Sequence, residues 1–263
     1  KGFVKWLLIG VSIVFLIVML VLPLVYVIYT ALREGWKVFV SSVTDEYAVK
    51  SIFLTVKVTV ITVIINSVFG IFAAWLITRF KFRGKKLIST LIDLPLTISP
   101  IIAGLIFVLT FGRQSAIYPF LEKWGIQIIF AVPGIVLATI FVTFPFISRE
   151  IIPVLTVKGT DEEEAAALMG ANGFQIFTQI TFPHIRWAFL YGVVLCSARA
   201  MGEFGAVSVL SGHLRGITNT MPLYIELLYQ AFDFTGAFAM SAILVVMALV
   251  ILVLKNIFEK SME

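Results

Sequence analysis

Two side chains of opposite charge, Arg199 and Glu203, lie inside an apolar stretch that runs from 187 to 210. An ionised side chain at the centre of a bilayer costs about 2.5 to 3.5 kcal/mol, so such residues face the interior of a helix bundle. Residues four apart share one face of a helix, which allows these two to pair. The pair could form a gate beside an anion pathway, or it could only pin this helix to its neighbours. Gly202 and Gly205 would permit a close helix approach or a helix break in either case.

A run of acidic residues forms a second group of interest. Asp161 to Glu164 follow Thr160 and precede three alanines. Acidic side chains in a first turn complement the positive end of the helix dipole. Thr160 and Glu163 have the spacing of a capping box. The sequence therefore predicts a helix that starts directly after Thr160.

The residues after this helix predict a turn and a second short helix. Gly170 ends the run of helix formers, and an apolar stretch from 174 to 180 precedes Pro183. We therefore predict a helix-turn-helix at the membrane surface. Its alanine side chains are small enough for another protein to approach the backbone closely. Composition alone equally allows a solvated connector.

The composition determines the class of protein that holds these groups. Of the 263 residues, 60% are hydrophobic and only 13% are charged, and the mean hydropathy is +1.05. So much apolar surface does not fit inside one soluble core. The same values exclude intrinsic disorder. We therefore expect an integral membrane protein. The net charge of +5 reflects basic residues near the ends of the spans, and it does not indicate a nucleic-acid partner.

The apolar runs predict an all-α polytopic membrane protein. About 20 apolar residues cross a bilayer core of about 30 Å as a helix, and continuous runs without alternation argue against a β-barrel. The first run is too long for a signal peptide and no small-residue cleavage pattern follows it, so we expect it to remain as a span. Six spans are predicted, at 6–32, 58–78, within 87–111, and at 128–148, 187–210 and 237–254.

The basic residues predict the orientation. Twelve Lys and Arg residues fall on one side of the six spans, seven fall on the other, and Arg199 lies within a span. The twelve include five in the acid-free loop 79–86. The positive-inside rule places this side, and with it both termini, in the cytoplasm. We interpret 1–263 as a single transmembrane domain whose longest cytoplasmic loop is 149–186. The outward segment 211–236 has no assigned role.

The other reactive side chains do not form a catalytic or metal-binding set. His184 and His213 are predicted on opposite sides of the membrane, so they cannot share a metal ion. Cys196 is the only cysteine and is interpreted as a small apolar residue. Asp93 is expected in an interfacial ion pair or a helix cap, and Asn66 in a hydrogen bond to another helix. Without a nucleophile and its base, a membrane enzyme is disfavoured.

Residues at fixed offsets in the loop 149–186 carry a family resemblance. Glu164-Ala165-Ala166 is followed after three residues by Gly170, after nine more by Ile180, and after one more by Phe182-Pro183. This spacing resembles the EAA signature of ATP-binding-cassette (ABC) importer permeases, which has Leu where this chain has Phe182. The resemblance implies the type I importer permease fold and a coupling helix that docks in a cleft of an ATPase subunit. The docking residues that it implies are Glu163, Glu164, Ala165, Ala166, Leu168, Gly170, Ala171, Ile180 and Pro183.

Further stretches resemble the sulfate and molybdate branch of these permeases. They are 74–80, 93–95, 99–100, 141–150, 185–209 and 221–228, so the resemblance covers nearly the whole chain. It implies a permease subunit that forms half of the translocation pathway of an ATP-driven sulfate or thiosulfate importer. A molybdate or tungstate importer built on two identical permease chains is the alternative. An ATP-independent anion carrier is a more distant one.

The resemblance also implies partners. They are ABC ATPase subunits, a second permease that is related or identical, an extracytoplasmic sulfate-binding protein, and the lipid of the inner (plasma) membrane. The chain has no Gly-x-x-x-x-Gly-Lys-Ser/Thr phosphate loop. It also has no soluble region large enough for a nucleotide-binding domain. We therefore expect no enzymatic activity and no cofactor on this chain, with ATP and Mg²⁺ bound by the ATPase.

Overall fold

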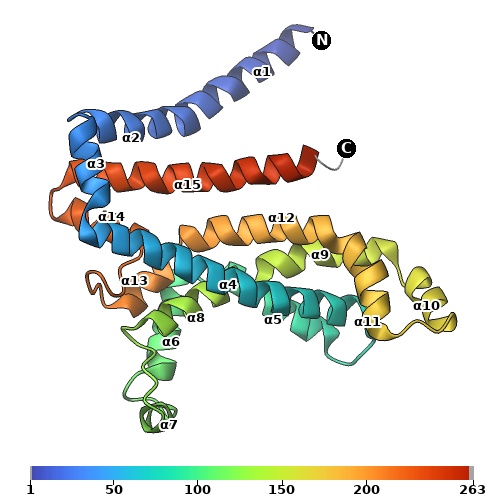
Figure 1. The fold of residues 1–263 in the computed structure, drawn as a ribbon. Helices are drawn as coiled ribbons and strands as arrows, with labels where there is room; N and C mark the ends of the chain where they lie inside the picture. The colour runs from blue at the N-terminus through green and yellow to red at the C-terminus, as the bar shows by residue number, and fades with distance from the viewer. Residues whose placement is uncertain (1, 261–263) are drawn as a thin grey trace.

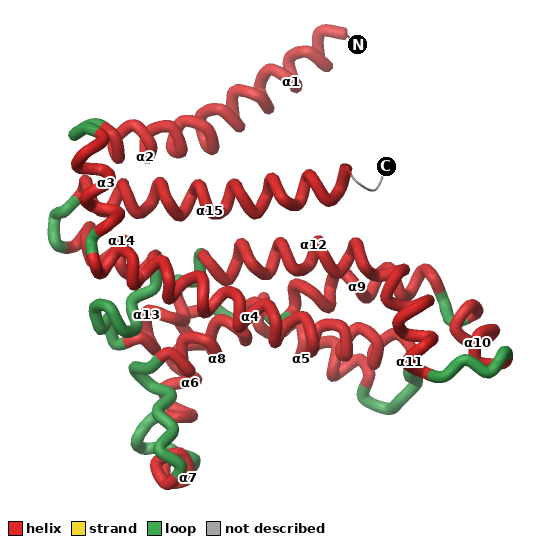
Figure 2. The backbone as a smooth tube through the Cα atoms, in the orientation of Figure 1, coloured by secondary structure: helices red, strands yellow, loops and turns green. Residues whose placement is uncertain are grey.

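The computed structural model describes residues 2–260, and its regular elements there are all helical. Figure 2 shows helices along the whole described chain, with loops only between them. Two π-helical turns, η1 and η2, interrupt the α-helices. In chain order the elements are α1 (Gly2–Leu16), η1 (Ile17–Val21), α2 (Leu22–Leu32), α3 (Trp36–Thr44), α4 (Glu46–Arg79), α5 (Lys85–Thr97), α6 (Pro100–Phe111), α7 (Tyr118–Lys123), α8 (Val132–Thr143), α9 (Pro145–Lys158), α10 (Asp161–Leu168), α11 (Gly173–Ile176), η2 (Phe177–Thr181), α12 (Phe182–Met201), α13 (Gly205–Ser211), α14 (Met221–Gln230) and α15 (Phe234–Lys260).

Four helical segments are long and apolar enough to cross a membrane. They are Val4–Leu32, Glu46–Arg79, Val132–Lys158 and Phe234–Asn256. Two bent pairs also meet this requirement when the helices of each pair are taken together: α5 with α6, and the continuous helix 173–201, which ends with α12, with α13. If each pair is one span, the number is the predicted six. The chain is a multi-pass membrane protein.

The third and fifth predicted spans are broken rather than straight. The axes of α5 and α6 meet at 110°, and the helix ending at Met201 meets α13 at 50°. Ile98 and Ser99 adopt extended backbone angles directly before Pro100, as the steric clash of a proline with the preceding residue favours. The prediction of one helix within 87–111 was therefore wrong in geometry, although the apolar segment was located correctly.

The helices also extend into the predicted loop 149–186. α9 continues to Lys158, with Pro153 inside it, and α12 begins at Phe182. The connection between them therefore runs from 159 to 181 and contains α10, α11 and η2. We call this segment the docking loop. In Figure 1 it lies beyond the ends of α9 and α12, at the opposite end of the bundle from α14.

The core lies where α4, α8, α9 and α12 pack together. Gly70 of α4 and Gly192 of α12 both face Ile147 of α9, and a Cβ at either position would lie within 2.9 Å of an Ile147 atom. Small residues thus bring the helix backbones close together, as in other membrane bundles. Asn66 donates from Nδ2 to Thr143 Oγ1 at 2.8 Å, which confirms the predicted hydrogen bond between helices. Cys196 is buried in this core.

The segment after the fifth span packs against the bundle. α14 begins at Met221, whose N–H donates to Thr55 Oγ1 of α4 at 2.8 Å. The Tyr224 hydroxyl donates to Asp45 Oδ2 at 3.1 Å. Burial, reinforced by the nearby Asp45 carboxylate, raises the pKa of Tyr224 to about 12. The outward segment 211–236 therefore contains a short helix, and its buried residues join the start of α4 to α15.

The first span contacts the bundle far less than the others. Figure 1 shows α1 diverging from the other helices, while α2 runs beside α15. Tyr26 of α2 packs edge-to-face on Phe238 of α15, with 6.2 Å between ring centroids. Ala31 is the first buried residue of the segment. Most of the apolar surface of this span is therefore available to lipid or to another chain.

Candidate functional site

The docking loop has the predicted helix-turn-helix shape. α10 covers the acidic run and the alanines, and it ends at Leu168. Gly170 has φ +91°, a conformation that glycine adopts without steric cost and that commonly ends helices. The N–H of Ala171 donates to the Ala166 carbonyl at 3.0 Å and closes the turn. Ile180 lies in η2, and Pro183 occupies the first turn of α12.

The predicted capping box at the start of α10 was wrong. Thr160 is the N-cap residue but makes no side-chain cap. Its hydroxyl donates instead to Glu164 Oε1 at 2.7 Å. A capping box occurs at α11, where Asn172 Oδ1 accepts from the Gln175 N–H at 2.9 Å and Gln175 Oε1 accepts from the Asn172 N–H at 2.8 Å. Glu163 cannot cap α10 because its carboxylate contacts another helix.

That contact is an ion pair with Arg79, the last residue of α4. Arg79 Nη2 donates to Glu163 Oε1 at 2.8 Å, and Arg79 Nε lies 2.8 Å from Glu163 Oε2. Only 9% of the Arg79 side chain and 15% of the Glu163 side chain are exposed. Sequence reasoning placed Arg79 among the cytoplasmic basic residues but did not predict this pair. The available signal was its position at the end of an apolar span.

The docking loop is open on the side away from the bundle. α10 has no buried residue. Leu168 is 90% exposed, Met169 is 89% exposed and Phe174 is 77% exposed. Large apolar side chains that share an exposed patch mark surfaces that another molecule covers. The predicted docking residues Glu164 and Ala165 are also exposed.

A second ion pair joins the docking loop to α12. His184 Nε2 lies 2.7 Å from Glu162 Oε2, and the pair is more exposed than that of Arg79. This hydrogen bond with His184 lowers the pKa of Glu162 below its ordinary value. The sequence did not predict this ion pair. Glu162 and His184 are 22 residues apart, and a separation of that size carries no helical periodicity that would indicate a contact.

The predicted pair inside the membrane is present. Arg199 Nη1 lies 2.6 Å from Glu203 Oε2, and the side chains are 33% and 1% exposed. Glu203 also accepts from the Ala206 N–H through Oε1 at 2.9 Å. It therefore joins the end of α12 to the first turn of α13 across the 50° break. The geometry allows a structural role for Glu203, and it leaves part of Arg199 accessible.

The two glycines of this region differ in what they permit. A Cβ at Gly205 would lie 2.9 Å from the Pro100 Cβ of α6, so a glycine is required for this close approach. Gly202 ends α12 at φ −91°, and a Cβ there would meet only the Ala198 carbonyl oxygen at 3.7 Å. The helix break and the close approach predicted for these glycines are therefore both found, at different residues.

Asp93 forms the predicted ion pair. Arg149 Nε lies 2.9 Å from Asp93 Oδ1, and both side chains are substantially exposed. The pair joins α5 to α9.

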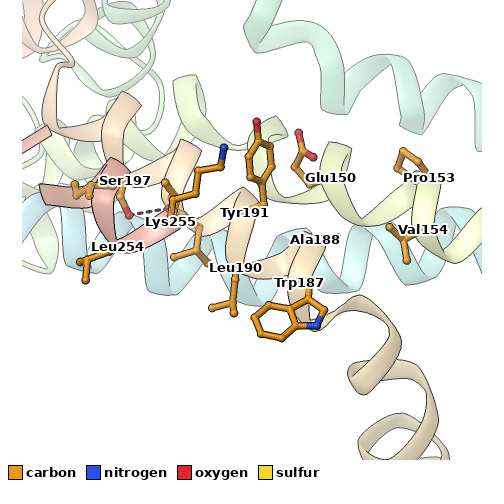
Figure 3. A pocket seen from close by; sticks show the side chains of 13 residues that line it. Glu150, Pro153, Val154, Trp187, Ala188, Leu190, Tyr191, Ser197, Leu254 and Lys255 are labelled. Carbon is orange, nitrogen blue, oxygen red and sulfur yellow. Dashed lines mark hydrogen bonds between the residues drawn. The ribbon is translucent and has the colours of Figure 1, made fainter. Parts of the chain in front are cut away.

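Next to Arg149 in the sequence, Glu150 lines a groove of about 680 Å³ between α9, α12 and α15. Figure 3 shows the polar ends of Glu150, Tyr191 and Lys255 pointing to the same side of this groove. The Lys255 ammonium lies 4.7 Å from the Tyr191 ring centroid.

Comparison with known proteins identifies the family. Residues 66–263 match the model of a family described as the binding-protein-dependent transport system inner membrane component. The chain belongs to this family. It is 45% identical over 259 residues to the sulfate transport system permease protein CysW of Escherichia coli (strain K12). The match covers 98% of this chain and 89% of the relative. It is 32% identical to the sulfate transport system permease protein CysT of Salmonella typhimurium (strain LT2), over 92% of this chain and 88% of the relative.

A solved structure shares the fold. It is one chain of a bacterial alginate ABC transporter, crystallised in complex with an alginate pentasaccharide-bound periplasmic protein. The TM-score is 0.83 at 19% sequence identity, and the match covers 99% of this chain and 95% of that chain. The chain therefore has the type I ABC importer permease fold implied by its EAA-like spacing. It is a membrane permease subunit, a transport component rather than an enzyme.

Proposed function

We propose that this chain is the permease subunit of an ATP-driven sulfate importer in the inner membrane, where it forms half of the anion pathway. The single observation that carries this proposal is the 45% identity to CysW over nearly the whole chain. The break between α12 and α13 supports it, because a charged pair lies at this break inside the bundle.

On this proposal the docking loop is the binding site for an ABC ATPase subunit. Its exposed apolar side chains, Leu168, Met169 and Phe174, supply the surface to be covered. Glu164, Ala165 and the Gly170 turn shape it. On this proposal the partner binds ATP and Mg²⁺, hydrolyses ATP and moves the loop. The loop then lies on the cytoplasmic side, as do both termini, in agreement with the distribution of basic residues.

A second permease completes the pathway. The similarity to CysT of 32% supports a partner that is related to this chain but different from it, a CysT-like subunit. Large exposed apolar side chains on α1, α2, α5 and α6 leave room for such a partner within the bilayer. Two copies of the present chain are the other arrangement that the experiment below resolves.

Selectivity on this proposal resides mainly in an extracytoplasmic sulfate-binding protein. A pathway must bind its ion weakly enough to release it, so a lone arginine that held a dianion tightly would block transport. In this proposal Arg199 supplies positive charge to the anion pathway. Glu203 fixes the position of the Arg199 side chain and the geometry of the break between α12 and α13. The exposed fractions of 33% and 1% support this division. Gly202 and Gly205 allow the break and the close approach of α6.

The test is purification of the chain from its native membrane in mild detergent, followed by mass spectrometry and reconstitution. We expect an ATPase and a second, different permease to accompany the chain. We also expect the proteoliposomes to take up radioactive sulfate when ATP and the binding protein are supplied. Uptake of molybdate in preference to sulfate, with this chain as the only permease, would establish the homodimeric alternative. Sulfate uptake by the isolated chain without an ATPase would contradict the proposal in favour of a carrier.

A further inference from the structure

The docking helix α10 is held to the bundle by polar contacts. It has no buried residue, so apolar packing against the core cannot fix its position. Two consecutive carboxylates reach back to the bundle instead: Glu162 contacts His184, and Glu163 contacts Arg79. The Glu162 pair is exposed to solvent, where ion pairs stabilise a structure little. The Glu163 pair is shielded, and it is the firm attachment of α10.

Arg79 has the geometry of a rigid connector. Its guanidinium engages both oxygens of the Glu163 carboxylate. This fork-like contact fixes orientation as well as distance. Its Nη1 donates at the same time to the Leu155 carbonyl near the end of α9, at 3.0 Å. One side chain therefore joins the last turn of α4 to α9 and to α10.

Glu163 extends the connection to α12. Its Oε1 also accepts from the Thr181 hydroxyl at 2.8 Å. Thr181 is buried and is the last residue of η2, directly before α12 begins. Single π-helical turns often mark functional positions in helices. α12 is the helix whose far end carries Arg199 and the break at Gly202.

We propose that Arg79 and Glu163 form the joint through which motion of the docking helix reaches α4 and α12, and so the break in the membrane. Both are positioning residues: they act on the pathway through helices and touch neither substrate nor nucleotide. The proposal rests on the proposed function, because it needs a partner that moves α10. The EAA-like spacing counts Glu163 among the docking residues, but its carboxylate is turned to Arg79 of the bundle. The surface left for the ATPase is instead that of the exposed residues Leu168, Met169 and Phe174.

The test compares Arg79→Gln, Glu163→Gln and the double variant in the complete transporter with its ATPase and binding protein. Glu163→Gln is nearly isosteric and retains an oxygen that can accept from Thr181. We expect each single variant to co-purify the ATPase within twofold of wild type and to lower sulfate uptake at least fivefold. Sulfate uptake by the double variant should be no lower than uptake by the more impaired single variant. If the two residues act only as a pair, removal of the second partner has no further effect. Glu46→Gln, which removes an exposed ion pair with Lys50 at the other end of α4, should leave uptake unchanged.

A second readout does not depend on the substrate. Spin labels introduced at the exposed residues Val68 of α4 and Leu105 of α6 should change their separation in wild type on addition of ATP and vanadate. We expect Glu163→Gln to abolish this change.

Three results would overturn the joint: wild-type uptake in both single variants, multiplicative losses in the double variant, or loss of the ATPase from the Glu163→Gln complex. The last would mean that the pair only shapes the docking surface. Absence of sulfate uptake in wild type would overturn the proposed function instead, and the spin-label distances would then decide on the joint alone.

Discussion

Gly205 of α13 lies against Pro100 of α6 so closely that a Cβ on residue 205 would stand 2.9 Å from the proline Cβ. The two residues sit at the two helix breaks of the structure, since Pro100 begins the helix after the 110° bend and Gly205 begins the helix after the 50° bend. The bent spans therefore touch where each of them resumes. A shift at one break is felt at the other, because packed helices do not deform continuously.

Gly205→Val is accordingly expected to destabilise the protein. The added side chain must displace α6, and overpacking of this kind costs about 1 to 3 kcal/mol. Thermal unfolding of the purified protein in detergent measures the loss. Gly10→Ala is the matched control, because a Cβ at residue 10 meets no atom within 4 Å and alanine is the better helix former. Equal unfolding temperatures for the two variants would contradict the close contact.

The pair of Arg199 and Glu203 should behave as one unit in stability. Removal of either charge leaves the other without its partner in a membrane helix, where unpaired charges are costly. We expect Arg199→Gln and Glu203→Gln to destabilise the protein individually, and the double variant to lose less than the sum. A coupling free energy of about 0.5 to 3 kcal/mol is typical of residues in contact. Thermal unfolding of all four proteins measures it, and strict additivity would exclude the pair.

Transport by the same variants separates the two residues. If Arg199 presents its charge to the pathway, Arg199→Lys should retain stability and sulfate uptake better than Arg199→Gln. Glu203→Asp should take up sulfate no better than Glu203→Gln, since the shorter aspartate side chain cannot reach both Arg199 and the Ala206 N–H. Equal uptake rates in Arg199→Lys and Arg199→Gln would argue that the arginine only braces the helix.

Charge reversal on the docking loop should uncouple the transporter. Glu164 is exposed, and among the described residues its carboxylate accepts a side-chain hydrogen bond from Thr160 alone. Glu164→Lys is therefore expected to insert normally and to lose ATPase binding. Co-purification of the ATPase measures the effect, and we expect at least a tenfold loss. Glu34→Lys makes the same change at an exposed residue between α2 and α3 and serves as control. Normal ATPase binding by Glu164→Lys would contradict the docking assignment.

Tyr224 predicts a pH dependence at the alkaline end. Its pKa is raised from 10.0 to about 12 in the folded protein, so the neutral hydroxyl is favoured by folding. The stability that it contributes is complete below pH 10 and is lost as the pH rises through about 12. Tyr224→Phe should remove this loss, whereas the exposed Tyr229→Phe should not. Unfolding temperatures across this pH window test the expectation, and an unchanged alkaline profile in Tyr224→Phe would contradict it.

The sequence predicted the fold class because membrane insertion demands long apolar runs, and such runs are visible residue by residue. It also predicted the pair of Arg199 with Glu203, because the two residues are close in sequence. Glu203, however, lies past the end of α12 in the helix break, and not on the same helix face as Arg199. The EAA-like spacing located the docking loop for a similar reason: its parts lie within one short segment.

The partners in contacts between distant segments were not predicted. Arg79 and Glu163 are 84 residues apart, and their pairing depends on how the ends of α4 and α10 meet in space. That contact also overrode a local rule, because Glu163 would otherwise have completed the capping box with Thr160. The 110° bend at Pro100 was missed in turn because a proline limits the backbone without stating the angle that tertiary packing selects.

The isolation of the first span has a consequence for how the protein is made. Every residue from Val4 to Pro23 is exposed. In hydrocarbon a helix satisfies its own backbone hydrogen bonds, so this segment needs the lipid and not the core of α4, α8, α9 and α12 to become ordered. It can thus enter the bilayer as a finished helix while the remaining residues are still being synthesised. The later helices can then pack beside a membrane anchor that is already in place.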